Sequence, residues 1–185
     1  MTEGMRLRPV VENDLAVLED MFVDPEGIGV FNFGGYRDPS VWRRDWAVNR
    51  LLTDDRSVLM VELDGVVLGF VSWHQKRTAA ASYCFEFGIS LLPAARGKGH
   101  GATAQLLLAR YLFAHSQVNR IQAFTEFDNI PEQRALEKAG FVREAVLVGL
   151  TFRDGAWRDE VLYRMLRAEL PVDDETDRQR AEDRG

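Results

Sequence analysis

Apolar residues recur along the chain in two kinds of segment, which predict alternating strands and helices. Short runs rich in β-branched and aromatic residues predict strands over Met5–Val10, Ser57–Leu63, Val66–Trp73, Tyr83–Leu92, Arg120–Phe127, Phe141–Phe152 and Ala156–Leu166. Longer segments with helical spacing or good helix formers predict four helices. The first begins after Asn13 or Asp14 and ends near Val23, and the others cover Val41–Leu52, Thr103–Ser116 and Asn129–Ala139. The order β-α-α-β-β-β-α-β-α-β-β indicates one mixed α/β domain.

Turn residues and composition mark the connections. Asp64-Gly65 and Asp154-Gly155 each separate two predicted strands, so both are expected to close β-hairpins. Residues 171–185 are charged and almost free of apolar side chains, which predicts a disordered tail.

Three aromatic residues stand in the glycine-rich stretch 25–39: Phe31, Phe33 and Tyr36. Such side chains are unusual in a solvated loop. They are expected either to anchor the loop to the core or to form a lid that contacts a substrate.

A glycine-rich turn joins the strand Tyr83–Leu92 to the next helix. Its residues are Arg96, Gly97, Lys98, Gly99, His100 and Gly101, followed by Ala102. Glycines let the backbone approach a ligand, and the first N–H groups of a helix have no internal partner. With two cations added, the turn predicts a site for a phosphate or pyrophosphate.

Three motifs compete for this turn. A Walker A loop fails because Gly99 follows Lys98 where Ser or Thr is required. A dinucleotide motif can be read over residues 99–104, with Glu126 ending the next strand, and leaves a nicotinamide-dependent oxidoreductase open. The pattern [Q/R]xxGx[G/A] fits Arg96–Gly101 at every position.

Composition narrows the class of protein. The chain has 185 residues, a net charge of −6 and no basic cluster, which argues against nucleic acid as a partner and suits a cationic amine. No apolar run is long enough to span a membrane, and neither a signal peptide nor a disulfide is expected, since Cys84 is the single cysteine. A cytoplasmic protein is predicted, with no membrane partner. His74, His100 and His115 lack metal-ligand spacing, so no metal is expected.

The turn resembles the acyl-CoA-binding loop of the GCN5-related N-acetyltransferases (GNAT superfamily). A second family motif is matched by Asn129, which opens a helix that closes in Gly140-Phe141. The resemblance covers residues 5–168 and is nearest to the ribosomal-protein-acetylase-like branch. It implies a single-domain GNAT fold, with a mixed central sheet of about seven strands and helices on both faces.

The resemblance also implies acetyl-CoA as cosubstrate, with its pantetheine arm paired to the strand before the turn. The residues expected to bind it are Ile89, Ser90, Leu91, Arg96, Gly97, Lys98, Gly99, His100, Gly101, Ala102 and Asn129. The turn would hold the pyrophosphate, and Asn129 would hydrogen-bond the pantetheine arm.

An amine must lose a proton before it attacks a thioester. Glu86, an acid within an apolar strand, is the first candidate base, and His74 at a strand end is the second. Alternatively, Glu86 lies on a solvated face or pairs with an arginine. The leaving thiolate needs an acid, but Leu136 stands where many relatives have Tyr. Glu132 stands where this branch has Ser, and its place in a helix capping box favours a structural role. The acid is left unassigned, with water as an alternative.

The sequence thus predicts an N-acetyltransferase that acts on a primary amine of a small molecule held under the aromatic loop. A protein N-terminus as acceptor, another acyl donor and a non-catalytic CoA-binding protein are the alternatives. A homodimer is left open.

Overall fold

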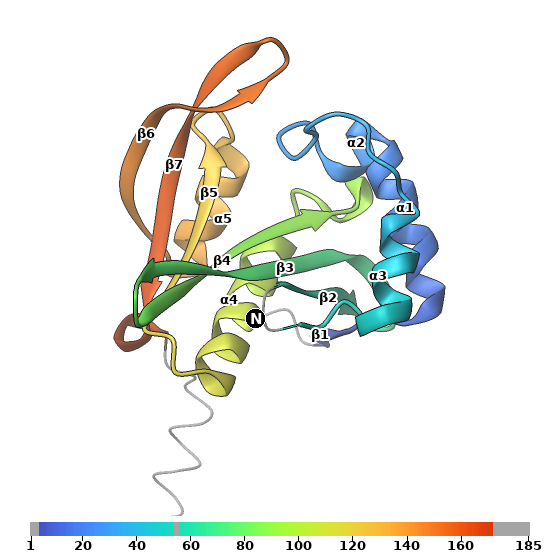
Figure 1. Cartoon of the computed structure of the whole chain (residues 1–185), viewed down its shortest axis with the longest axis horizontal. Coiled ribbons are helices and arrows are strands. Elements are labelled where there is room, and N and C mark those ends of the chain that lie inside the picture. Colours follow the sequence, from blue (N-terminus) through green and yellow to red (C-terminus); the bar gives the residue numbers. More distant parts are fainter. Residues whose placement is uncertain (1–3, 54–55, 172–185) are drawn as a thin grey trace, which may run out of the picture.

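The computed structural model describes residues 4–53 and 56–171. Its strands form one seven-stranded sheet in the order β1-β2-β3-β4-β5-β7-β6 (Figure 1). The strands are β1 (Met5–Pro9), β2 (Arg56–Leu63), β3 (Val66–Ala79), β4 (Ser82–Leu91), β5 (Arg120–Glu126), β6 (Val142–Arg153) and β7 (Ala156–Leu166). The β4–β5 pair is parallel and all the others are antiparallel.

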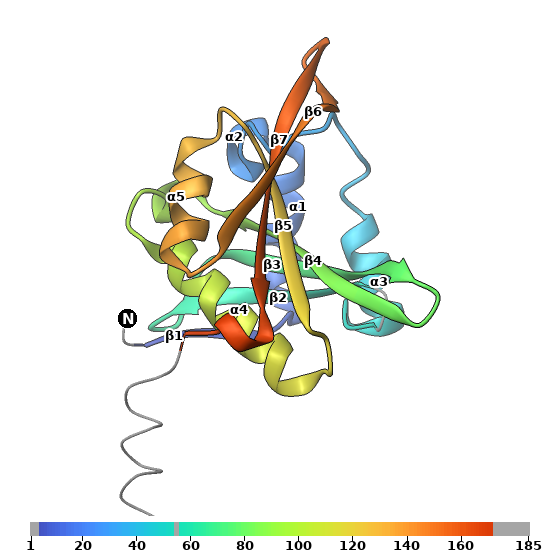
Figure 2. The ribbon, with the colours of Figure 1, turned by 90° about the vertical axis from the view of Figure 1, so that its left-hand side faces the viewer.

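Helices cover both faces of the sheet, as predicted. The α-helices are α1 (Leu15–Val23), α2 (Pro25–Ile28), α3 (Val41–Asn49), α4 (His100–His115) and α5 (Ile130–Lys138), and short 3-10 turns cover Glu12–Asp14, Pro93–Ala95 and Arg167–Glu169. Figure 2 shows α4 and α5 on one side and α3 on the other, with the tip of the β6–β7 hairpin standing out beyond them. The mixed α/β fold class is confirmed.

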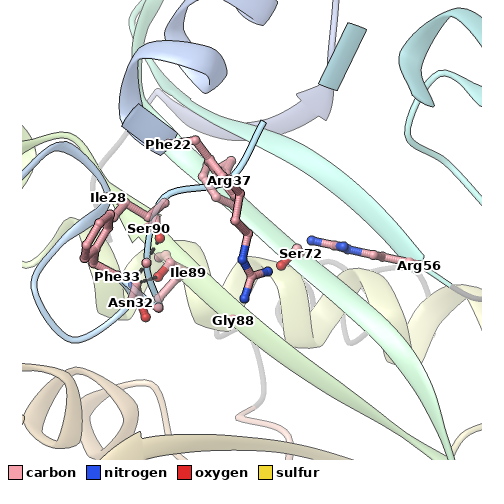
Figure 3. A pocket seen from close by; sticks show the side chains of 13 residues that line it. Phe22, Ile28, Asn32, Phe33, Arg37, Arg56, Ser72, Gly88, Ile89 and Ser90 are labelled. Carbon is pink, nitrogen blue, oxygen red and sulfur yellow. Dashed lines mark hydrogen bonds between the residues drawn. The ribbon is translucent and has the colours of Figure 1, made fainter. Parts of the chain in front are cut away.

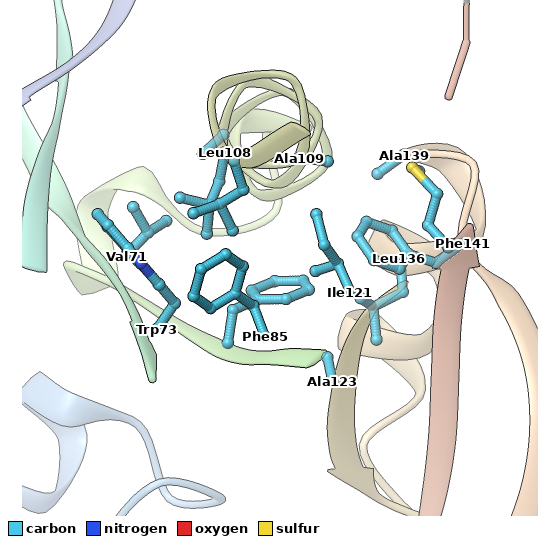
Figure 4. Close-up of a cluster of buried hydrophobic side chains, with 14 of the residues drawn as sticks. Val71, Trp73, Phe85, Leu108, Ala109, Ile121, Ala123, Leu136, Ala139 and Phe141 are labelled. Atoms are coloured by element: carbon cyan, nitrogen blue, oxygen red, sulfur yellow. The ribbon is translucent and has the colours of Figure 1, made fainter. Parts of the chain in front are cut away.

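Strand alternation produces two separate cores. Phe85 and Phe87 of β4 point to the face covered by α4, where Leu108 and Ile121 pack with them (Figure 4). On the opposite face, α1 and α3 pack on the sheet through a second cluster centred on residues such as Met60. Because successive residues of a strand point to opposite faces, Glu86, Gly88 and Ser90 of β4 point away from Phe85 and Phe87.

Several boundaries differ from the sequence prediction. Helix α2 lies in the stretch expected to be a loop, because Asp24 accepts a hydrogen bond from Glu26 N (3.0 Å) and Pro25 fits a first helical turn. Strand β3 runs six residues beyond Trp73, since its polar end pairs with the start of β4. Helix α4 begins at His100 rather than Thr103.

The sequence also predicts a disordered tail over residues 171–185 and no membrane-spanning segment. The predicted tail lies outside the described residues, apart from Pro171. No helix in the described part of the chain has the length and apolarity needed to cross a membrane.

Strands β4 and β5 pair over only two positions, Phe85 with Ile121 and Glu86 with Gln122. Beyond Glu86 the two strands diverge, as Figure 1 shows. Residues 87–91 of β4 pair with β3 on one side, and no described strand pairs with them on the other.

Gly69 fixes how closely β3 approaches the end of β4. Its φ is +147°, and a Cβ at this position would lie 2.1 Å from the Ser90 carbonyl oxygen and 2.7 Å from Leu91 Cα. Both are backbone atoms, so no side-chain rotation relieves the overlap. The end of β4 is therefore held where it is because residue 69 has no side chain.

Replacing Gly69 by Ala should lower the free energy of unfolding by about 3 kcal/mol, because strands β3 and β4 must separate locally. Urea denaturation measures this change. The matched control is Gly88→Ala in β4, where a Cβ would meet nothing closer than Ser72 Oγ at 4.0 Å. Equal midpoints for the two variants would contradict the assigned role of Gly69.

Candidate functional site

Two cavities meet at the open end of β4. The larger, of about 640 Å³, is lined by residues 28–32, the end of β4, the glycine turn and α5, and is called here the glycine-turn pocket. The smaller, of about 200 Å³, lies on the other side of residues 28–34 and contains Arg37 and Arg56, and is called the arginine pocket. Both are lined by Ile28, Asn32, Ile89 and Ser90.

The glycine-turn pocket brings together most residues predicted to bind acetyl-CoA. Its wall includes Ile89, Ser90, Leu91, Arg96, Gly97, Gly99, Gly101, Ala102 and Asn129. These come from the end of β4, the turn, the first turn of α4 and the start of α5. Their proximity follows from the divergence of β4 and β5, which leaves the space that they surround.

The glycines of the turn leave open space where a larger residue would place its side chain. Gly97 and Gly99 have φ of +72° and +81°, and a Cβ at Gly97 would meet nothing within 4 Å. Helix α4 starts directly after Gly99 without a side-chain cap, so its first N–H groups are available to an anion. The shape and the dipole both suit a phosphate.

Lys98 and His100 lie differently from the other predicted residues. Lys98 lines an adjoining cavity of about 370 Å³ that shares Gly99, Ala102 and Lys138 with the glycine-turn pocket. His100 has a buried Nδ1 with no hydrogen-bond partner among the described residues.

The side chain of Arg96 braces the backbone. Its Nε donates to the Leu91 carbonyl (2.8 Å) and its Nη2 to the Gly27 carbonyl (2.7 Å), which ties α2 to the end of β4. These bonds use Arg96 Nε and Nη2, two of the guanidinium donors that the sequence analysis expected to bind the pyrophosphate. Arg134 and Lys138 of α5 add positive charge to the same pocket.

Asn32 is a site residue that the sequence analysis missed. Its Nδ2 donates to the Ile89 carbonyl (3.2 Å) and to Ser90 Oγ (3.0 Å), at the junction of the two pockets. A single polar residue in an aromatic loop carries no signal of such a contact. Only the packing of the loop on β4 shows it.

The three aromatic residues of that loop separate. Phe31 lines the glycine-turn pocket, and Phe33 lines the arginine pocket. Tyr36 is 78% exposed, and its ring stacks edge-on against Phe33 at 5.2 Å between centroids. The first two therefore stand in pocket walls, whereas Tyr36 contacts Phe33 from outside.

Glu86 is paired with a cation, as one alternative expected, although the cation is Lys76 and not an arginine. Lys76 Nζ lies 2.8 Å from Glu86 Oε2, and Gln122 Nε2 donates to the same oxygen at 3.0 Å. His74 Nε2 lies 3.7 Å from Glu86 Oε1. Glu86 and His74 lie on the face of the arginine pocket, but neither is among the described residues that line it.

Glu132 does not cap α5, which corrects the structural role expected from the sequence. Its carboxyl group turns to α4, where Gln105 Nε2 donates to Oε1 at 2.6 Å, and the residue lines the glycine-turn pocket. Burial raises the pKa of Glu132 to about 8, although the Gln105 hydrogen bond acts in the opposite direction. Burial thus favours the protonated form of Glu132.

Leu136 and Cys84 are both core residues. Leu136 is buried in the core, so the position of the usual family Tyr is filled by packing. Cys84 is also buried, and burial raises the pKa of its thiol, as befits a core residue. No group of three potential metal ligands occurs in residues 4–53 and 56–171.

Comparison with known proteins identifies the family. The family model of the acetyltransferase (GNAT) domain matches residues 5–142. The uncharacterized N-acetyltransferase p20 of Bacillus licheniformis is 28% identical over 176 residues, covering 91% of this chain and 96% of its own. The prophage-derived uncharacterized N-acetyltransferase YokL of Bacillus subtilis is 22% identical over 170 residues, covering 92% and 94%.

Solved structures share the fold at lower identity. Spermidine N-acetyltransferase from Vibrio cholerae, in complex with CoA and spermine, has a TM-score of 0.74 at 19% identity and covers 90% of this chain and 98% of its own. RimJ of Mycobacterium smegmatis, in complex with CoA-disulfide, has a TM-score of 0.72 at 24% identity, with 91% and 84% covered.

The family match decides against a nicotinamide-dependent oxidoreductase, and the assignment of the glycine turn as an acyl-CoA-binding loop stays a prediction. Placement in the ribosomal-protein-acetylase-like branch stays a prediction. With a sheet that opens after Glu86 and a glycine turn facing the opening, the chain belongs to the acetyltransferase (GNAT) domain family and is an N-acetyltransferase with acetyl-CoA as cosubstrate.

Proposed function

We propose that this enzyme moves an acetyl group from acetyl-CoA in the glycine-turn pocket to a primary amine of a small molecule in the arginine pocket. The observation that carries this proposal is that both pockets open onto Ile89 and Ser90, where β4 has left β5. A thioester and an amine bound on the two sides would meet there.

On the donor side, the edge of β4 turned away from β3 offers the backbone N–H groups of Ile89 and Leu91 to a pantetheine arm, because their carbonyls already accept from Asn32 and Arg96. Asn129 lines the same glycine-turn pocket. The open glycines and the start of α4 suit the pyrophosphate. Arg134 and Lys138 suit the further phosphate charge.

On the acceptor side, the cavity of about 200 Å³ fits a small molecule better than a folded protein surface. Phe33 and Phe22 form apolar parts of its wall. The fold neighbour from Vibrio cholerae acts on spermidine, as its name states, which agrees with an amine acceptor in a chain of this shape.

Proton transfer requires two groups. We keep Glu86 as the candidate base, because it points to the same face of β4 as Gly88, which lines the arginine pocket. His74 pairs with Glu86 across the strands. We assign the acid to Glu132. When the amine nitrogen bonds to the carbonyl carbon and the carbon–sulfur bond breaks, Glu132 gives its proton to the leaving sulfur, and the proton lost by nitrogen passes to the base or to water.

Replacing Gly99 by Val should weaken acetyl-CoA binding at least tenfold, about 1.4 kcal/mol, because the side chain fills the turn and strains a positive φ. Calorimetric titration measures this. Gly155→Val is the matched control, since Gly155 also has positive φ (+76°) but lies in the β6–β7 turn. Equal affinities in the two variants would remove the turn from the donor site.

Glu86→Gln should lower kcat by roughly a hundredfold if Glu86 is the base. Lys76→Met keeps the carboxylate but deletes its partner, and it should lower kcat much less. If Glu86 only pairs with Lys76, both variants will show the same small loss of kcat.

Glu132→Gln should lower kcat by roughly a hundredfold and abolish an alkaline limb near pH 8, because Gln cannot donate the proton to sulfur. Acetyl-CoA affinity should be nearly unchanged. The control is Glu137→Gln, a carboxylate of the same helix that accepts from the Tyr163 hydroxyl (2.9 Å). An alkaline limb that persists in Glu132→Gln would exclude this acid.

The same variant gives a readout independent of activity. With its folded pKa raised, Glu132 binds a proton that the unfolded chain has already lost between about pH 4.5 and 8, so the stability of the wild type falls across this range. Glu132→Gln lacks this fall. The Tm difference, variant minus wild type, should therefore grow from pH 5 to pH 9.

The whole proposal is tested by thiol release with saturating acetyl-CoA and a panel of small primary amines. Turnover of a small amine supports it. Acetylation restricted to peptide N-termini would favour a protein acceptor, and tight acetyl-CoA binding without turnover of any amine or peptide would favour a non-catalytic role.

A further inference from the structure

Two arginine side chains converge on the arginine pocket. Arg37 reaches down from the loop before α3, and Arg56 reaches in from the start of β2. Figure 3 shows both guanidinium groups turned toward the space above Ser72. No aspartate or glutamate is among the described residues that line this pocket.

Neighbouring arginines are paired, which makes this pair distinctive. Arg43 binds Glu19 (2.8 Å), and Arg44 binds Asp38 (2.7 Å). Within the described residues, Arg37 and Arg56 form no ion pair that would neutralise them. Two like charges that face one space repel each other, and an anion between them removes that repulsion.

Within residues 4–53 and 56–171, the acids on adjoining walls do not neutralise the two arginines. Asp38 is held by Arg44 and accepts from the Ser40 N–H (3.0 Å) and hydroxyl (2.7 Å). Asp45 of α3 lines a neighbouring cavity that Arg37 and Arg56 also line, but within the described residues it forms no ion pair with either arginine. Glu86 is held by Lys76.

We infer that the acceptor amine carries an acidic group, a carboxylate or a phosphate, that binds between Arg37 and Arg56. The inference rests on the proposed function and names its substrate class. Arginine suits this task because its planar fork can donate two parallel hydrogen bonds to a carboxylate or phosphate. A polyamine would instead bring further positive charge to the two guanidinium groups.

The sheet sets the length of such an acceptor. Ser90 pairs with Phe70, and Gly88 pairs with Ser72 two residues along the strand. At about 3.4 Å per residue, the acetyl-transfer point and the arginine end are roughly 7 Å apart. An amine and an acid separated by five or six bonds would span this distance, as in an ω-amino acid.

The experiment compares acceptors that differ only at the far end: 6-aminohexanoate, 5-aminopentyl phosphate, the neutral 6-aminohexanamide and 1,6-diaminohexane. Thiol release at saturating acetyl-CoA gives kcat/KM for each. We expect the better anion to exceed the amide by at least roughly tenfold and the diamine by more, since the site then leaves two guanidinium groups unpaired. The order of carboxylate and phosphate shows which anion the pair prefers.

Variants locate the effect. Arg37→Met and Arg56→Met should each reduce the preference for the anion over the amide toward unity, with acetyl-CoA affinity and Tm unchanged. Arg43→Met, an exposed arginine of α3 paired with Glu19, is the control and should keep the preference.

Two results overturn the inference without touching the proposed function: equal or better turnover of the diamine, or an anion preference that survives both Arg37→Met and Arg56→Met. Acetyl-CoA binding without turnover of any of the four amines overturns it as well. Failure to bind acetyl-CoA would overturn the proposed function, and the inference with it.

Discussion

The backbone of β4 beyond Glu86 has hydrogen-bonding groups on two sides and a neighbouring strand on only one of them. Unpaired strand edges are ready templates for another extended chain. In this enzyme the free edge faces a cavity rather than bulk solvent, and the glycine turn closes the far end of that cavity. The glycine-turn pocket depends on this divergence, which leaves the space that its residues surround.

The divergence holds because contacts on each side fix the end of β4. Gly69 lets β3 approach Ser90 closely, while Asn32 and Arg96 bind the carbonyls of Ile89 and Leu91 from the other side. Each contact uses a backbone atom. The site is therefore positioned by backbone geometry, and the side chains of the strand are left to line the pockets.

Charge is distributed unevenly between the two pockets. The glycine-turn pocket is lined by Arg134 and Lys138 of α5 and by Glu132, whose pKa is raised by burial. In the arginine pocket two guanidinium groups face an apolar wall. The net charge of −6 for the chain is therefore a poor guide to this pocket, whose described lining residues include two arginines and no acid.

The sequence by itself determined the order of elements apart from α2, the two hairpins and the position of the glycine turn before α4, whose role as an anion site stays a prediction. Local signals suffice for these, since turn chemistry and helix termini depend on adjacent residues. Tertiary structure decided the rest: that Glu132 contacts Gln105 instead of capping its own helix, that Arg96 bonds to backbone carbonyls, and that Asn32, Arg37 and Arg56 line one pocket. These residues are far apart in the chain, and only packing of the loop and of α4 on the sheet brings them to one place.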